Sequence, residues 1–326
     1  MNTTTIAWLA GTGAMALALV QATPAAAQPA FPDKPVRIVV PFAAGGVTDA
    51  MLRLLQEPVG RSLGQPVIID NRPGAAGMIA ARLVADAPAD GYTVLVVNTG
   101  LIAITPFVQK SAGIDPQRRF APVAGLSSAP SVLLVHPSVP VADLRQFLDY
   151  AKANPGKLEY AVVGKGAYGD VATSLFQRQA GVRMLPVPYQ GNAQTTTALL
   201  SGEVKVQLTI LSGPMNDYLK NGRIKALGVA TAGPSALVPG VPPIASALPG
   251  FDAVVYTGLV APARTPPAVV EKIGHAFTTA LSDPALRQQL ATMGMEAAPL
   301  DGKAYSERIA REIGAFAPVI KELGTE

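Results

Sequence analysis

Short β-branched runs alternate with longer stretches of helical periodicity along most of this chain, and this alternation restricts the fold more than any other feature. The first set of expected strands covers residues 36–40, 67–69 and 94–97. Helices are expected from Thr48 onward and over Met78–Ala87. Alternation of this kind predicts a parallel sheet with helices on both faces.

A second set of strands and helices follows the first and indicates a second lobe. The expected strands are 132–135, 160–163, 185–187, 206–210, 224–230 and 254–260, and the expected helices are 141–153, 169–180, 267–281 and 305–323. Pro and Gly interrupt the segment Gly233–Gly250 repeatedly, so we interpret it as a connection between lobes. The sequence therefore predicts an α/β fold of two lobes with a cleft between them.

Composition excludes several classes of protein. Of the 326 residues, 49% are hydrophobic and 15% are charged, which argues against a disordered chain. The 26 basic and 22 acidic residues are scattered, whereas a nucleic-acid binder concentrates Lys and Arg, so no nucleic-acid partner is expected. The absence of Cys excludes disulfides and thiolate metal sites. His136 and His275 lack a metal-ligand pattern, and no G-x-S-x-G elbow occurs, so we expect no metal, no cofactor and no enzymatic activity.

The first 27 residues have the pattern of a secretory signal peptide. Ile6–Val20 is continuously apolar or small, and Ala25–Ala27 supplies a cleavage site before Gln28. The apolar stretch is shorter than the ~20 residues that a membrane helix needs. We expect cleavage after Ala27 and a periplasmic location. The alternative is an uncleaved anchor, since no Lys or Arg precedes the apolar stretch.

Two segments place a glycine-rich loop between a strand and a helix. The candidate ligand-binding residues in the first loop are Phe42, Ala43, Ala44, Gly45, Gly46, Thr48 and Asp49, and those in the second are Gly164, Lys165, Gly166, Ala167 and Tyr168. The second loop matches G-x-G-x-x-G, but the acid that holds a ribose about 20 residues later is missing, because Glu203 is the next acid after Asp170. This gap argues against a dinucleotide.

Amides at a helix N-terminus lack partners within the helix and carry a partial positive charge, so both loops could hold a carboxylate without any Arg. The alternative is that the glycines only permit tight turns. Asp49 either caps its helix or accepts a hydrogen bond from a ligand. Lys165 is either a solvated surface residue or an ion-pair partner for a ligand carboxylate.

Seven blocks of sequence, in order from residue 31 to the C-terminus, resemble the Bug family, the extracytoplasmic solute receptors of tripartite tricarboxylate transporters. The blocks are 31–49, 71–77, 89–93, 120–123, 151–158, 187–191 and 258–262. The resemblance implies a type II periplasmic binding protein, a Venus flytrap with two crossover connections. It implies lobes of 31–129 plus 254–326 and of 130–253.

The resemblance also implies how this chain works. It implies a monomeric receptor, not an enzyme, that captures a small mono-, di- or tricarboxylate through the amides of both loops and delivers it to the permease subunits. Aromatic and amino acids are included in this ligand class. Further ligand-binding residues are implied outside the loops: Asn71, Thr99, Tyr189 and Thr209. A periplasmic sensor feeding a two-component system and, less favoured, a secreted enzyme on the same fold are the alternatives.

The chain departs from the family pattern at the variable end of the pocket. The family usually has Ser or Thr and then His in the second loop, where this chain has Ala167, Tyr168 and Asp170. Lys205 and Thr209 stand where acidic residues are frequent, and Tyr256 replaces a common Trp. The identity of the carboxylate therefore cannot be transferred from another member of the family.

Overall fold

The computed structural model describes residues 31–109, 113–211 and 215–324. The expected signal peptide, residues 1–27, lies outside the described residues. Pro32–Glu326 forms one compact unit, and the account below concerns its described part. No helix among these residues combines the length and the apolar character that crossing a membrane requires.

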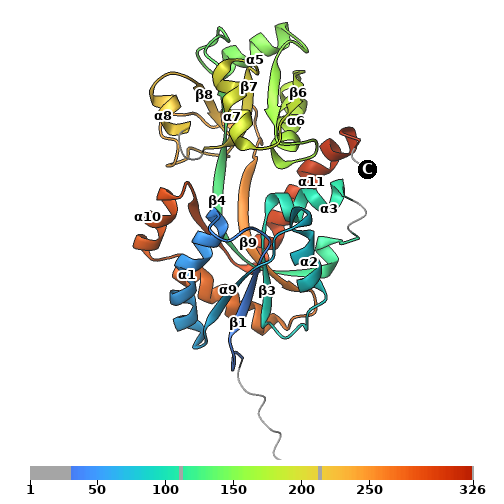
Figure 1. Cartoon of the computed structure of the whole chain (residues 1–326), viewed down its shortest axis with the longest axis vertical. Coiled ribbons are helices and arrows are strands. Elements are labelled where there is room, and N and C mark those ends of the chain that lie inside the picture. The colour runs from blue at the N-terminus through green and yellow to red at the C-terminus, as the bar shows by residue number, and fades with distance from the viewer. Residues whose placement is uncertain (1–30, 110–112, 212–214, 325–326) are drawn as a thin grey trace, which may run out of the picture. The chain divides into compact units, whose positions relative to one another are not determined.

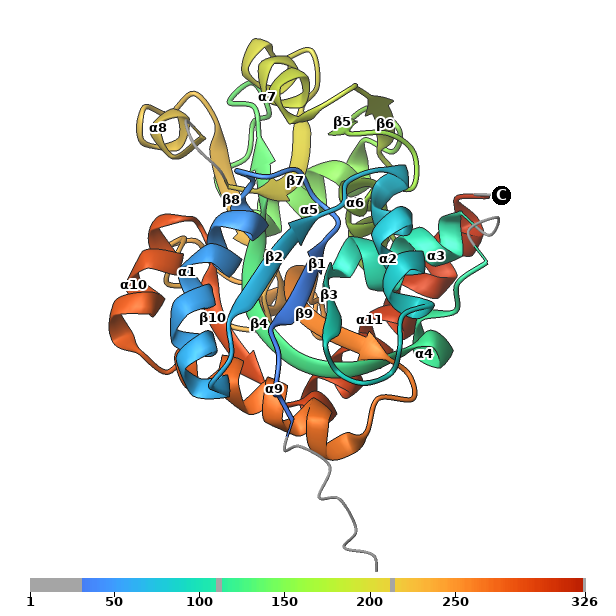
Figure 2. The ribbon, with the colours of Figure 1, turned by 60° about the horizontal axis from the view of Figure 1, so that its bottom comes forward.

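The first part of the chain builds a sheet of predominantly buried strands. Its strands are β2 (Val67–Asn71), β1 (Val36–Val40), β3 (Thr93–Asn98), β9 (Val254–Pro262), β4 (Phe120–Val135) and β10 (Glu296–Leu300), which pair in that order. In β1, Val36, Ile38, Val39 and Val40 are at most 1% exposed, because helices lie on both sides. Figure 2 shows α1 (Val47–Leu63) and α2 (Met78–Ala85) flanking β2, β1 and β3.

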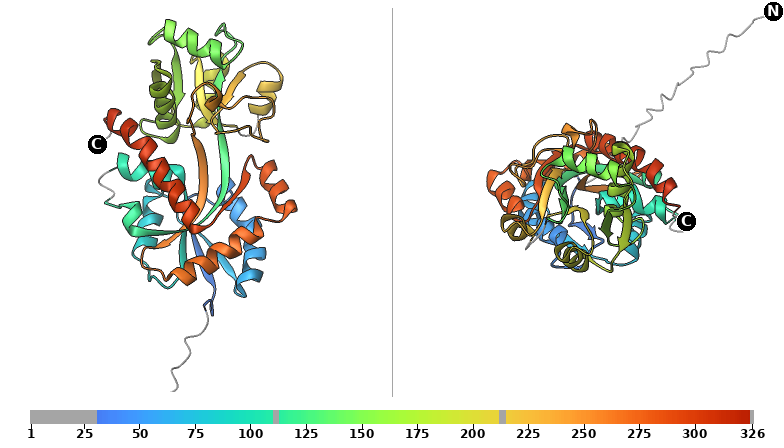
Figure 3. Two further views of the ribbon diagram at one scale, coloured as in Figure 1. Left: turned by 180° about the vertical axis from the view of Figure 1, so that it is seen from behind. Right: turned by 90° about the horizontal axis from the view of Figure 1, so that it is seen from above.

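The predicted parallel sheet is confirmed for β1, β2 and β3, and the strands beyond them are antiparallel. β1 pairs in parallel with β2 and β3, but β9 runs antiparallel to β3 and to β4, and β10 runs antiparallel to β4. The physical reason is the path of the chain: β4 leaves this sheet for a second one, and β9 returns in the opposite direction. Figures 1 and 3 show both strands running side by side between the two groups of elements.

The second sheet shares β4 with the first. Phe120–Pro130 of β4 pair with β9, whereas Ser131–Val135 pair with β7 (Val206–Ile210) and with β8 (Lys225–Val229). β5 (Glu159–Val162) and β6 (Leu185–Pro188) complete it in parallel. Around it are α5 (Leu144–Ala153), α6 (Tyr168–Ala180), α7 (Asn192–Ser201) and α8 (Met215–Lys220). One 16-residue strand thus belongs to both sheets, and it changes sheet at Pro130–Ser131.

The segment Gly233–Gly250 does not connect the lobes, which corrects the sequence-based interpretation. It lies against the second sheet: Val229 forms a bridge with Pro243, and Ile244 in the short 3-10 helix Ile244–Ser246 is fully buried. Phe251 follows and packs edge-on against Phe176, with ring centroids 5.9 Å apart. The chain returns to the first sheet only in β9, so β4 and β9 are the connections.

The remaining helices are α3 (Thr105–Val108), α4 (Pro116–Arg119), α9 (Pro267–Ala280), α10 (Pro284–Thr292) and α11 (Gly302–Glu322), with a π-helical turn at Gly100–Ile104. The C-terminal helix α11 contacts both β4 and α6. An ion pair between Arg178 of α6 and Glu322 of α11 lies at its far end. This helix therefore touches elements around both sheets.

Candidate functional site

The first glycine loop joins β1 to α1 and is closed by an aspartate. Gly45 has a φ of +80°, which favours glycine, and its N–H donates to Asp49 Oδ2 at 2.9 Å. Gly46 is the N-cap of α1 with a φ of −72° and has no side-chain cap. Because Gly46 has an ordinary backbone conformation, the turn itself needs glycine at position 45.

The carboxylate of Asp49 accepts hydrogen bonds from two further residues besides Gly45. Arg53 Nε donates to it at 2.8 Å, and Asn71 Nδ2 donates at 3.0 Å while also bonding to the carbonyl of Phe42 at 3.1 Å. The Arg53 hydrogen bond, aided by those from Gly45 and Asn71, outweighs burial and lowers the pKa of Asp49 to about 2. This geometry favours the first interpretation of Asp49, an acid in the first turn of α1 whose carboxylate is bound by the protein, here closing the loop before the helix.

The second loop, between β5 and α6, has the same geometry. Gly166 has a φ of +74°, and its N–H donates to Asp170 Oδ2 at 2.9 Å. Asp170 is 1% exposed and accepts a second hydrogen bond from the Tyr160 hydroxyl at 3.0 Å. Ala167 takes the place of Gly46 as the N-cap, with a φ of −68° and no side-chain cap. We call each Gly–Asp closure, Gly45–Asp49 and Gly166–Asp170, an aspartate latch.

The matching of the two loops extends to their backbone bonds. Gly46 N–H donates to Ala43 O at 3.3 Å, and Ala167 N–H donates to Gly164 O at 3.4 Å. In both helices, the N-cap residue has no side-chain cap, so the first amides of the helix, at Val47–Asp49 and at Tyr168 and Gly169, point out of the helix end, whereas Asp170 N–H donates to Ala167 O at 3.0 Å. Each latch therefore precedes a helix whose N-terminus has no side-chain cap.

Both helix N-termini lie at the point where β4 changes sheet. Val47, the first residue of α1, lines the same hollow as Pro130. On the other side, the Tyr168 hydroxyl donates to Ala253 O at 2.6 Å and lies 3.1 Å from Ser131 Oγ. Burial raises the pKa of Tyr168 well above its ordinary value. Tyr168 therefore ties the second loop to both connecting strands.

The other predicted ligand-binding residues occupy varied surroundings. Thr99 is 1% exposed, accepts from Tyr256 N–H at 2.9 Å and donates to Val254 O at 3.4 Å, so its hydroxyl joins β3 to β9. The Tyr189 hydroxyl donates to Glu203 at 2.8 Å. Burial is the larger cause and this hydrogen bond the smaller one of a rise in the pKa of Tyr189 to about 12. Thr209 is half-buried on β7, and Lys165 is exposed on the second loop.

Sequence reasoning missed the role of Asp170 and the partners Arg53 and Ser131. The signal for Asp170 was available, since Gly45–Asp49 and Gly166–Asp170 share a spacing of four residues. Ser131 had no such signal, because it meets Tyr168 only through the tertiary fold.

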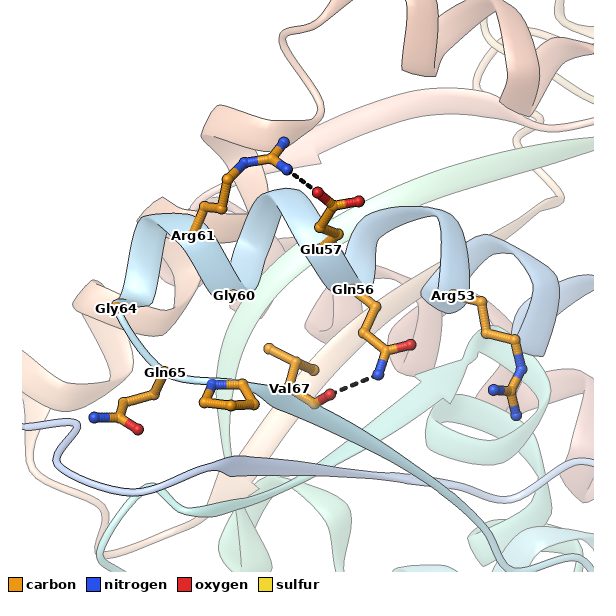
Figure 4. Close-up of a pocket in the computed structure, with 9 residues that line it drawn as sticks. Arg53, Gln56, Glu57, Gly60, Arg61, Gly64, Gln65 and Val67 are labelled. Carbon is orange, nitrogen blue, oxygen red and sulfur yellow. Dashed lines mark hydrogen bonds and ion pairs between the residues drawn. The ribbon is translucent and has the colours of Figure 1, made fainter.

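A separate groove of about 560 Å³ runs along α1 and contains none of the predicted residues. Figure 4 shows that several of its side chains bond within it: Arg61 pairs with Glu57, and Gln56 donates to Val67 O at 2.7 Å. These side chains already have partners within the protein, and we assign no ligand to this groove.

We expect the Asp170→Ala variant to lose both stability and ligand affinity. The change leaves Gly166 N–H and the buried Tyr160 hydroxyl without their acceptor, which costs about 1–3 kcal/mol of unfolding free energy. Chemical denaturation measures the stability, and calorimetry measures the affinity. Asp149→Ala on the exposed surface of α5 is the matched control, and equal behaviour of both variants would contradict the latch.

Two sheets joined by two strands, with two open helix N-termini at the joint, define a two-lobe periplasmic binding protein of type II. Solved structures support this class: the periplasmic binding protein BugD aligns with a TM-score of 0.68 at 28% identity, over 91% of this chain and 99% of that one.

The chain belongs to the tripartite tricarboxylate transporter receptor family, whose model, described as "Tripartite tricarboxylate transporter family receptor", matches residues 51–325. Protein BugT of Bordetella pertussis is 30% identical over 300 residues, which are 91% of each chain. MatC from Rhodopseudomonas palustris, solved with bound malate, aligns with a TM-score of 0.68 at 32% identity over 89% of this chain and all of that one. Rpa4515 from R. palustris, solved with adipate, aligns with a TM-score of 0.72 at 32% identity over 90% and 98%.

Proposed function

We propose that this protein is a periplasmic receptor that captures a small carboxylate between its two lobes and delivers it to a tripartite tricarboxylate transporter permease. The observation that carries the proposal is the pair of aspartate latches, each beside an uncapped helix N-terminus at the crossing point of β4. Solved relatives that hold malate and adipate support a carboxylate as the ligand.

The chemistry of the two loops suits a carboxylate. Lys165 is the one charged cationic side chain within the described loops 41–46 and 163–167, and it is exposed, so the main-chain amides supply most of the attraction. Hydrogen bonds from amides to a charged acceptor contribute roughly 1.5–3 kcal/mol each. A carboxylate that bridges both loops would favour the closed arrangement of the lobes.

Several further points belong to the same proposal. We infer lobes of residues 31–129 plus 254–326 and of 130–253, a monomer, cleavage after Ala27 and no enzymatic activity. The lobe boundary is supported by the change of sheet at Pro130–Ser131 and by the start of β9 at Val254.

Thermal-shift measurements with a panel of carboxylates test the proposed function. We expect at least one carboxylate to raise the midpoint of unfolding in a concentration-dependent way, because a ligand that binds only the folded state stabilises it. The matching primary amides, which keep the shape but lack the charge, serve as controls. Stabilisation by the amides alone, or by neither series, would contradict an anion site at the helix ends.

A further inference from the structure

A hollow of about 230 Å³ begins at the first residue of α1, directly after the first glycine loop. Its walls come from α1, from the crossing of β4, from Leu211 directly after β7, from α8, from the segment 237–238 and from the end of α10. The lining residues are Val47, Pro130, Leu211, Asn216, Leu237, Val238, Ala291, Thr292, Met293 and Gly294. The hollow therefore adjoins the first of the two loops that form the proposed carboxylate site.

The side chains that line this hollow are uncharged and mostly apolar, and polar atoms supply the rest of its surface. Among the described residues that form it, Asn216 and Thr292 are the two polar side chains, and neither carries a charge. Val47 is 55% exposed even though it is a large apolar side chain next to the loop. An apolar wall of this kind accepts hydrocarbon, whereas a second carboxylate would lose its hydration there without meeting a cation.

The walls are held together across the two groups of elements. Ser235 Oγ donates to Glu296 at 2.6 Å, which ties the segment that carries Leu237 and Val238 to β10. Gly294, at the end of α10, lies so close to Leu211 that a Cβ added to it would stand 3.5 Å from the Leu211 carbonyl oxygen. The hollow thus has walls from both groups of elements, and its rim at Val47, Asn216 and Thr292 is exposed to solvent. Its volume exceeds the roughly 150 Å³ that suffices to hold a benzene ring.

We infer that the ligand is a monocarboxylate with an apolar chain or ring, whose carboxylate binds the helix N-termini and whose apolar part occupies this hollow. The inference rests on the proposed function and narrows it to one class of carboxylate. Val47, Leu237 and Met293 are then specificity-determining residues, because they decide what the far end of the ligand can be.

Calorimetric titration of the wild-type protein with ligands of equal length tests this inference. Hexanoate and adipate share a six-carbon chain and differ only in the second carboxylate, and benzoate supplies an aromatic case. We expect hexanoate or benzoate to bind at least about tenfold more tightly than adipate, since the second carboxylate of adipate has no partner in the hollow. Equal or tighter binding of adipate would overturn the inference.

A charge placed in the hollow should reverse this preference. We expect Met293→Lys to weaken hexanoate binding and to strengthen adipate binding relative to hexanoate by about tenfold, because the new ammonium faces the end of the chain. Leu185→Lys, on β6, adds the same charge outside the hollow and should leave the ratio unchanged. If Met293→Lys fails to fold, Leu237→Gln replaces it, and a selective loss of hexanoate affinity is the expected result.

The outcomes separate this inference from the proposed function. Binding of adipate that is unaffected by both hollow variants would overturn the apolar subsite and leave the carboxylate receptor standing. No binding of any mono- or dicarboxylate by the folded wild-type protein would overturn both.

Discussion

Replacing Gly166 by valine is expected to reduce carboxylate affinity by more than a hundredfold, whereas Lys165→Ala reduces it by less than about fivefold. Valine disfavours the φ of +74° that Gly166 adopts, and Gly166 is buried in the turn that leads into α6, so the substitution disturbs the loop that presents the amides. Lys165 is exposed, so its contribution to binding is screened by solvent. Gly45→Val, at a φ of +80°, should behave like Gly166→Val.

The chain supplies a matched control for each loop. Gly181 ends α6 with a φ of +65° and Gly64 ends α1 with a φ of +73°, and neither has an atom within 4 Å of an added Cβ. Gly181→Val and Gly64→Val therefore introduce similar backbone strain at the opposite ends of the same helices. Calorimetry on the folded variants should show normal affinity for these controls. A hundredfold loss in Lys165→Ala, with binding retained in Gly166→Val, would mean that an ion pair holds the ligand.

The second large effect is expected at Arg308, which lies in a buried ionic cluster behind β9. Its guanidinium donates to Asp252 and, through Nε at 2.8 Å, to Glu312, and it stacks 3.9 Å from the centre of the Tyr256 ring. Arg308 and Glu312 are 8% and 6% exposed. Removing one partner of a buried ion pair leaves an uncompensated charge, so Arg308→Met should lower the free energy of unfolding by about 3–5 kcal/mol.

The same cluster predicts a pH dependence of stability. Burial raises the pKa of Glu312 to about 7 from its ordinary 4.5, although Arg308 opposes the shift. The folded state therefore holds a proton that the unfolded state releases. The stabilisation from this group is complete below about pH 4.5 and is lost as the pH rises through about 7.

Denaturation curves between pH 5 and 8 check both expectations. In Glu312→Gln the part of the stability that falls between these pH values should disappear, because the group no longer titrates. The double variant Arg308→Met with Glu312→Gln should regain part of the loss seen in Arg308→Met. A flat pH profile for the wild-type protein would contradict the raised pKa of Glu312, and no recovery in the double variant would show that the two side chains are not coupled. Arg311→Met, an exposed neighbour on α11, is the control.

The local elements were largely predictable from the sequence, and the strand β4 shows where prediction fails. Val132–Val135 was expected as a strand because it is a short β-branched and leucine run. Phe120–Ser131 was not, because Pro122, Gly125 and Pro130 disfavour a strand locally. In the fold this stretch gains β9 and β10 as partners, with irregular register near Pro122 and Gly125. Its tertiary pairing overrides its local preference.

The candidate site likewise contains some features that the sequence predicts and others that only the tertiary fold creates. The sequence predicts the two strand–glycine–helix units and the spacing of Asp49 and Asp170 from their glycines. Each of these features depends only on residues within about five positions of one another. The sequence does not predict the neighbours of Thr99 and Tyr168, because Thr99 bonds to Tyr256 across 157 positions and Tyr168 bonds to Ala253 across 85.

The sequence by itself determined the α/β elements, the two glycine loops and the helix N-termini that could hold an anion, because backbone sterics and hydrophobic periodicity act over short distances along the chain. Only the tertiary structure decided that β4 belongs to both sheets and that β9 runs antiparallel to it in the first. It also brought both helix ends to Pro130–Ser131 and buried Arg308 between Asp252 and Glu312. These features depend on which surfaces, distant in the sequence, pack together in the fold. Buried charges interact strongly only after that packing has excluded water from around them.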